Sequence, residues 1–227
     1  VMKSWNFAFV ASHDLNEPLR KIISFGNRLL DKAKNLEPDA KAYAEKMQSS
    51  AKRMQTMIED LLKYSMASVR GEAFRSIDLN QVVRDVLEDL EASITATQGV
   101  IRAEGLPTLE ADPVQMRQLF QNLISNALKF HKKEQAPQIE LVAKPVRKDS
   151  WDIDIKDNGS GLNVEQKENI FQPFIRLNGR SDYEGSGIGL AICKKIMARH
   201  NGNIEVSSSD EGGSTFKVTL PIKQSSR

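Results

Sequence analysis

Apolar residues recur every three or four positions over residues 2–30. At about 100° per residue, this spacing gathers them into one stripe along a helix. The members of the stripe are Phe7, Ala11, Leu15, Leu19, Ile22, Phe25 and Leu29. The pattern predicts a long amphipathic helix. Pro18 lies inside it and predicts a local bend, because proline lacks an N–H and clashes with the preceding turn.

A second periodic run follows a connector at residues 34–39 and predicts a second helix. Its apolar positions are Tyr43, Met47, Met54, Ile58, Leu61 and Leu62. Two long helices in succession form an antiparallel hairpin. One hairpin with a single apolar stripe per helix cannot close a core, so we expect a homodimer in which two chains build a four-helix bundle.

The pattern changes at about Ser76, where short β-type runs begin to alternate with helical stretches and predict a mixed α/β domain. Strands are expected over 138–146, 151–156, 203–207 and 214–220, and helices near 80–97, 113–132 and 187–200. Asn80 and Asp112 are the expected helix caps, and Pro113 suits a first helical position because no donor is needed there. We therefore divide the chain into a helical hairpin over 1–72 and an α/β domain over 73–227.

Composition and charge exclude several classes of protein. The 227 residues are 40% hydrophobic, and 32 basic residues stand against 30 acidic ones, so no basic field makes nucleic acid an expected partner. No apolar run approaches the roughly 18 residues that span a bilayer, and residues 1–9 do not resemble a signal peptide.

The single Cys193 cannot form an intrachain disulfide, and its apolar surroundings predict a small buried side chain in a protein of the reducing cytoplasm. The chain starts without Met in a helical pattern, so we expect a piece of a longer protein.

His13 lies about 170° from the centre of the apolar stripe and so faces water or a docking partner. Most histidines on such a face are simply solvated. Asp14 changes the interpretation, because a neighbouring carboxylate can hold one imidazole nitrogen as N–H and leave the other free to attack phosphorus. The alternative is that Asp14 is an ordinary polar residue beside the stripe.

Three further segments carry candidate chemistry. Asn122, Asn126 and Lys129 are spaced by four and three and share one helical face, where amide oxygens can hold Mg²⁺ and the ammonium can offset phosphate charge. An ordinary polar helix face gives the same spacing.

Asp157 follows the expected strand at 151–156, and the segment continues through Gly159 and Gly161. A carboxylate at a strand end can accept an adenine amino N–H, and glycines allow the backbone to approach a flat base. The same letters also form a common turn.

Glycines alternate with other residues in the segment Gly185, Ser186, Gly187, Ile188, Gly189 and Leu190, just before an apolar helix. Backbone N–H groups at a helix start suit phosphate. A dinucleotide fold is the alternative, but no βαβ unit with a strand directly before the glycines is visible.

The string from His13 to Leu19 resembles the phosphoacceptor box of sensor histidine kinases, and the three other segments follow in that family's order and spacing. The resemblance extends from about Phe7 to Pro221. It implies that Asn126 ligates Mg²⁺, that Asn122 and Lys129 assist the phosphates of ATP, and that Asp157 recognises adenine. Glycine positions implied at the nucleotide are Gly159, Gly161, Gly185, Gly187 and Gly189, together with Leu190. Arg176, after Phe171-Gln172-Pro173-Phe174, resembles the root of the family's ATP lid and would contact the terminal phosphate or remain solvated.

The resemblance implies an α+β multi-domain protein, in which the helical hairpin is followed by an α/β sandwich ATP-binding domain of the gyrase and histidine kinase type. Such a protein autophosphorylates with ATP and Mg²⁺, with His13 and Asp14 as catalytic residues. It then transfers the phosphoryl group to an aspartate in the receiver domain of a response regulator. The box is most like that of phytochrome-like kinases, which implies an N-terminal sensory module outside this fragment.

Glu17 stands where many members carry Thr or Asn, so phosphatase activity is not implied. A gyrase-like or chaperone-like ATPase would share the ATP segments, but it has no reason to carry a hairpin with His13 beside Asp14. A scaffold that only dimerises would tolerate loss of Asn126 or Asp157, yet both are present.

Overall fold

A computed structural model describes residues 2–32, 37–66, 71–175, 186–208 and 212–224. For residues 2–14 it describes the backbone and not the side chains. In that part of the chain no helix carries a stretch apolar enough, over sufficient length, to span a membrane.

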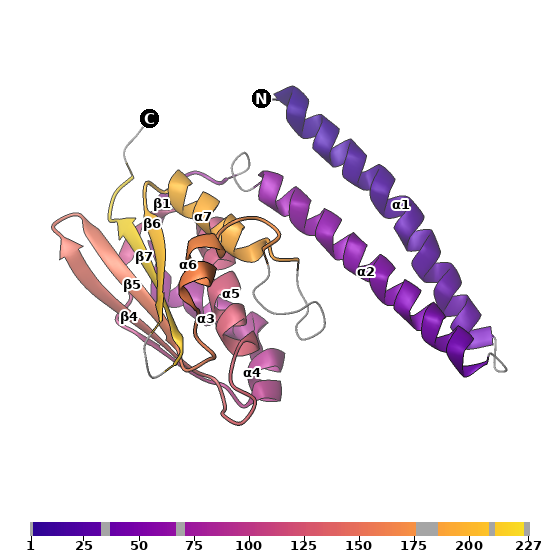
Figure 1. The fold of residues 1–227 in the computed structure, drawn as a ribbon. Helices are drawn as coiled ribbons and strands as arrows, with labels where there is room; N and C mark the ends of the chain where they lie inside the picture. The colour runs from indigo at the N-terminus through magenta and orange to yellow at the C-terminus, as the bar shows by residue number, and fades with distance from the viewer. Residues whose placement is uncertain (1, 33–36, 67–70, 176–185, 209–211, 225–227) are drawn as a thin grey trace.

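The N-terminal region is the expected hairpin of two long helices, α1 (Met2–Lys32) and α2 (Pro38–Met66), which lie side by side in Figure 1. Pro18 is accommodated within α1. The connector is shorter than the sequence indicated, because Pro38 opens α2 instead of preceding it. Proline is suited to a first helical turn, where its missing N–H has no partner to lose.

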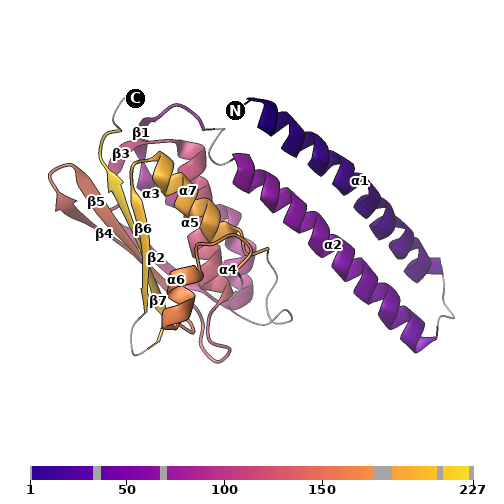
Figure 2. The same cartoon turned by 45° about the horizontal axis from the view of Figure 1, so that its top comes forward.

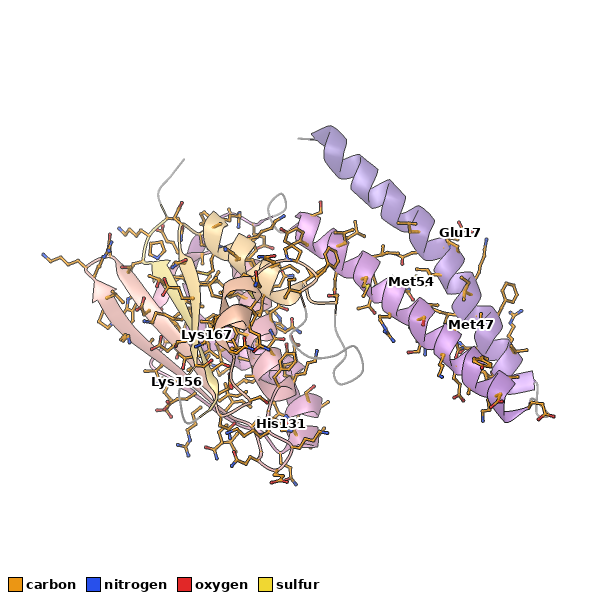
Figure 3. The ribbon with its side chains drawn as sticks, in the orientation of Figure 1. Glu17, Met47, Met54, His131, Lys156 and Lys167 are labelled. Atoms are coloured by element: carbon orange, nitrogen blue, oxygen red, sulfur yellow. The ribbon has the colours of Figure 1, made fainter. Side chains whose placement is uncertain are left out.

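Within a single hairpin, most of the apolar stripe stays in contact with solvent. Leu19 and Ala51 are buried, but the other large side chains are not. The exposed set is Leu15, Ile22, Phe25, Leu29, Tyr43, Met47, Met54 and Leu61. Figure 3 shows Met47 and Met54 along α2, away from the α/β region. This exposed set, which we call the hairpin stripe, is a surface that one chain alone does not cover.

The rest of the chain forms an α/β region built on a five-stranded sheet in the order β2-β4-β5-β7-β6. The strands are β2 (Val100–Glu104), β4 (Gln138–Arg147), β5 (Ser150–Asp157), β6 (Asn203–Ser208) and β7 (Ser214–Pro221). Only the pair β2 and β4 is parallel. A separate antiparallel pair consists of β1 (Arg75–Asp78) and β3 (Thr108–Ala111).

The helices of this region pack on one face of the sheet, as Figures 1 and 2 show. They are α3 (Leu79–Asp89), α4 (Glu91–Thr97), α5 (Pro113–Lys129), α6 (Val164–Asn169) and α7 (Gly189–Arg199). Side chains of α5, α7 and the central strands form the core between the two layers, among them Phe120, Leu123, Ile124, Ile153, Ile155, Ile196 and Val218. Cys193 is buried there, as predicted.

Several elements differ from the sequence predictions. The helix expected over 80–97 is two helices that meet at Leu90, and the side chain that caps the first is Asp78, which accepts from the backbone N–H of Asn80. The helix α6 and the strands β1, β2 and β3 were not predicted. Each has six residues or fewer, so its apolar pattern is a weak signal, although the six-residue β6 was predicted.

The junction between the hairpin and the α/β region is anchored on its C-terminal side. Arg199 donates to the carbonyl of Glu72 at 2.7 Å and to the Asp112 carboxylate at 2.7 Å. The ring of Phe74 lies 4.6 Å from the Arg199 guanidinium and 5.0 Å from the ring of His200. Residues 72–74 are held by side chains, whereas residues 67–70 lie outside the described chain.

Candidate active site

A cavity of about 280 Å³ opens between α5, the end of β5, α6, the start of α7 and the start of β7. It brings together segments that are up to 156 residues apart in the sequence, from Asp60 on α2 to Phe216 on β7. Seven of the candidate residues named from the sequence line it: Asn126, Lys129, Asp157, Gly161, Gly187, Gly189 and Leu190.

The helix α5 supplies the polar side of the cavity. Asp112 fixes its start by accepting from the N–H groups of Val114 and Gln115, at 3.0 and 3.1 Å. From there, Asn126 and Lys129 project into the cavity. Asn122 does not line it. Its side-chain amide donates instead to the carbonyl of Gly189 at 3.2 Å, which ties α5 to the first residue of α7.

Asp157 lies at the end of β5 with its carboxylate partly buried in the cavity wall. One carboxylate oxygen accepts from the backbone N–H of Gly159 at 2.8 Å and from that of Ser214 at 3.1 Å. Burial raises the pKa of Asp157 above the usual range, and the two N–H donors act in the opposite direction. The carboxylate is therefore fixed in position and offers an acceptor to whatever enters the cavity.

Two glycines beside Asp157 leave no room for a side chain. A Cβ on Gly159 would lie 2.6 Å from the carbonyl oxygen of Phe130, and one on Gly213 would lie 2.0 Å from the carbonyl oxygen of Asp157. Gly213 also has a φ of 86°, which side chains rarely adopt. Gly213 was not predicted from the sequence, because its role depends on β7 lying beside β5.

An apolar wall of the cavity was also missed from the sequence. It is made by Leu162, Ile170, Ile175 and Phe216. In the sequence these residues are indistinguishable from core positions, since a hydrophobic residue that faces a cavity has the same pattern as one that faces the core. The wall suits a flat, weakly polar group, with the Asp157 carboxylate placed to orient it.

The remaining side of the cavity is the segment before α7. Ser186 and Gly187 line it, and α7 begins two residues later at Gly189. An eleven-residue helix directs its free N–H groups and the positive end of its dipole toward this side. Asp60 of α2 also reaches the cavity and accepts a hydrogen bond from the Ser186 hydroxyl. No pattern in the sequence predicts a hairpin residue at the cavity.

Other candidate residues fall outside the described part of the chain. Arg176 and Gly185 belong to the interval 176–185, which the structure does not describe. His13 and Asp14 lie on α1, but their side chains are outside the description. Their assignments remain predictions.

Two family models match this chain. Residues 6–70 match the His Kinase A (phospho-acceptor) domain, and residues 111–224 match the histidine kinase-, DNA gyrase B-, and HSP90-like ATPase. The first match covers the hairpin, and the second begins just before α5 and includes the whole cavity apart from Asp60.

Individual relatives agree with the family models. The chain is 39% identical to cyanobacterial phytochrome A of Nostoc sp. over 95% of its length and 28% of that protein's length. It is 36% identical to phytochrome-like protein Cph1 of Synechocystis sp., over 95% of the chain and 29% of the relative. The chain thus spans under a third of these two relatives.

A solved structure shares the whole fold. Full-length ShkA in complex with AMPPNP superposes with a TM-score of 0.71 at 22% identity, over 98% of this chain and 47% of that one. At this identity the likeness concerns the arrangement of hairpin and α/β region.

Proposed function

This chain belongs to the histidine kinase family, and we propose that it binds ATP in the cavity, phosphorylates its own His13 and passes the phosphoryl group to an aspartate of a response regulator. The observation that carries the proposal is Asp157. It is a partly buried carboxylate, held by two backbone N–H groups, at the wall of a cavity whose neighbouring positions admit only glycine.

The base of ATP fits the end of the cavity at Asp157. The carboxylate would accept from the adenine amino group, with Gly159 and Gly161 allowing close approach of the backbone. The apolar wall of Leu162, Ile170 and Phe216 provides a surface on which a planar ring packs. A residue with a side chain at position 159 would push into the carbonyl of Phe130, so the pocket depends on that glycine.

The phosphates fit the polar end. Lys129 supplies a positive charge, and the segment from Gly187 to the start of α7 supplies N–H groups at a positive helix end. The amide oxygen of Asn126 is a hard, neutral ligand of the kind that Mg²⁺ accepts when phosphate oxygens and water complete its shell. Bound there, Mg²⁺ would neutralise charge on the phosphates. Arg176 and Gly185 are proposed to contact the phosphates from the neighbouring segment.

Phosphoryl transfer to His13 is proposed to begin from the neutral imidazole. Its unprotonated nitrogen attacks the γ-phosphorus, the P–N bond forms, and the bond to the β-phosphate oxygen breaks so that ADP leaves. The other ring nitrogen carries a proton that must be lost afterwards, and Asp14 is placed in sequence to hold that N–H and accept its proton. In the second step a regulator carboxylate oxygen attacks phosphorus, the P–N bond breaks, and the imidazole regains a proton.

The hairpin stripe is the basis for proposing a homodimer. Eight large apolar side chains remain exposed on a single hairpin, which is more contiguous apolar surface than a soluble monomer usually presents. A second copy would cover it as a four-helix bundle. Sedimentation at micromolar concentration should give a dimer, and a monomer would contradict this part of the proposal.

Three further assignments complete the proposal. The boundary between the two domains falls at residues 72–73, next to the carbonyl that Arg199 holds. A sensory module at the N-terminal side of the hairpin would supply the signal, as the likeness to phytochromes favours. The activity belongs to the cytoplasm, where ATP is the available phosphoryl donor.

The decisive experiment incubates the purified chain with γ-labelled ATP and Mg²⁺ and tests the acid lability of the label. Phosphohistidine hydrolyses in acid, whereas phosphoserine does not. Label that is acid-labile in the parent and absent from His13→Gln supports the proposal. Acid-stable label, or label that survives in His13→Gln, would contradict it.

A further inference from the structure

The C-terminal end of α2 is docked on α7, beside the cavity. Lys195 of α7 donates to the backbone carbonyl of Tyr64 at 3.0 Å, and its ammonium lies 3.6 Å from the centre of the Tyr64 ring. Desolvation at this contact lowers the pKa of Lys195. The hairpin and the ATP-binding region are therefore joined by a defined contact between two helices.

Asp60 lies one helical turn before Tyr64, on the same face of α2. The docking at Tyr64 consequently brings the Asp60 carboxylate to the cavity, where it accepts a hydrogen bond from the hydroxyl of Ser186. Ser186 is itself buried. A carboxylate from the hairpin thus occupies the end of the cavity that faces the start of α7.

This position is the one assigned above to phosphate. Ser186 precedes Gly187 and Gly189 in the glycine segment, and Asn126 and Lys129 line the same cavity. A carboxylate and a phosphate seek the same donors and repel one another at short range, strongly so where water is partly excluded. The Asp60 carboxylate and a phosphate cannot both accept from the Ser186 hydroxyl and lie at the start of α7.

We propose that Asp60 is a nucleotide-sensing residue, whose carboxylate substitutes for the phosphate of ATP when the site is empty and is displaced when ATP binds. The inference rests on the proposed nucleotide site. Phosphate binding and the docking of α2 on α7 then exclude each other. Nucleotide binding releases the ATP-binding region from α2, which leaves it free to approach His13, and docking in turn weakens nucleotide binding by the same factor.

A comparison of ligands with and without phosphate tests this assignment, because adenosine carries the base of ATP and none of its phosphate charge. Binding of adenosine, ADP with Mg²⁺ and ATP with Mg²⁺ is measured by calorimetry for the parent, for Asp60→Asn and for the control Glu59→Gln. Glu59 is the exposed neighbour on α2. Removing the Asp60 charge should tighten ATP by about tenfold, a Coulomb effect of ordinary size, and leave adenosine unchanged. The control should change neither.

The remaining outcomes overturn the inference in distinguishable ways. Equal ATP affinity in the parent and Asp60→Asn would reject the displacement while leaving the nucleotide site intact. Weaker ATP binding in Asp60→Asn would make Asp60 a ligand of the bound nucleotide and Mg²⁺, the opposite role. If none of the three compounds binds the parent, the proposed function fails and this inference fails with it.

The docking contact provides a second, independent variant. Lys195→Gln removes the contact with Tyr64 and should also raise the affinity for ATP. Lys194→Gln is the matched control, because it removes a neighbouring positive charge that lies over Phe171 instead. Asp60→Asn removes the carboxylate charge, and Lys195→Gln releases the helix that holds this carboxylate in the cavity. Because both changes act through the same carboxylate, the double variant Asp60→Asn with Lys195→Gln should bind ATP no more tightly than Asp60→Asn alone. Additive effects would mean that the docking and the carboxylate act separately, which contradicts the proposal.

Discussion

The two regions of this molecule differ in how far they bury their apolar residues. In the ATP-binding region, Leu119, Phe120, Leu123 and Ile124 on α5 are fully buried at 0% exposure. On the hairpin, Phe25 and Met47 are 64% and 65% exposed although both lie in a regular apolar stripe. The first region closes its core within one chain. The second presents an apolar stripe that one chain alone does not cover, as the proposed dimer would require.

This difference assigns separate tasks to the two regions. A closed core gives the rigid frame that holds Asn126, Lys129 and Asp157 around one cavity. The open hairpin carries the proposed acceptor, His13, on the long helix α1. Phosphoryl transfer depends mainly on positioning, so a rigid donor site and an accessible acceptor are both required.

The largest expected effect comes from substituting one residue in each region and comparing autophosphorylation with ATP affinity. His13→Gln and Asp157→Asn should both abolish autophosphorylation, but only Asp157→Asn should lose ATP affinity, by about 100-fold or more, because a fixed carboxylate acceptor for the base is replaced by an amide. Labelling and nucleotide titration are run on both variants. If His13→Gln binds ATP as weakly as Asp157→Asn, the division into acceptor and donor regions is wrong.

The next effect concerns chemistry within the hairpin. Asp14→Asn should slow autophosphorylation by about 10²- to 10⁴-fold, the usual size of general-base assistance, and leave the ATP dissociation constant nearly unchanged. Glu17→Ala is the matched control, since Glu17 pairs with Lys21 on the exposed side of α1 and should matter less to the forward reaction. Single-turnover labelling at saturating ATP gives both rates. A rate for Asp14→Asn within about threefold of the parent would remove its role in proton transfer.

Replacing one leucine by alanine in each region compares the closed core with the exposed hairpin stripe. Leu123→Ala leaves a cavity in a closed core and should lower the free energy of unfolding of the ATP-binding region by about 2–5 kcal/mol. Leu29→Ala, in the hairpin stripe, should leave that transition unchanged and raise the dimer dissociation constant instead. Denaturant unfolding and sedimentation are compared for the two variants. An equal loss of unfolding free energy in both would contradict the distinction between a closed and an open core.

The smallest effect concerns pH and the anchor behind the cavity. Burial, with the adjacent Arg199 acting in the same direction, holds the pKa of His200 below its ordinary value, and its ring accepts from the backbone N–H of Asp112 at 3.1 Å. A histidine with a lowered folded pKa contributes stability that is present above the unfolded pKa of about 6.5 and is lost as the pH falls through the folded pKa. Between pH 7 and 5, the free energy of unfolding should therefore decline more in the parent than in His200→Gln. Parallel pH profiles for the two proteins would exclude His200 as the titrating group.

The sequence by itself determined the elements with long or regular patterns. The two hairpin helices, α5, α7 and four of the sheet strands follow from apolar periodicity and from the caps at their ends, because these depend on residues close in the chain. The same local reasoning identified Asn126, Lys129 and Asp157, since spacing on one helix and position after a strand are properties of the sequence. The resemblance named the family, and the family matches confirmed that family, whereas the roles of these residues stay predictions.

Only the tertiary structure decided what lies opposite those residues. Gly213 matters because β7 pairs with β5, and the apolar wall with Phe216 exists because α6 and β7 meet across the cavity. Asp60 is 126 residues from Ser186, yet the two are hydrogen-bonded because α2 docks on α7. Such contacts arise from the packing of distant elements, so no pattern along the chain records them. Local periodicity determined which residues share one face of a helix or strand. The packing of the helices on the sheet determined what each of those faces contacts.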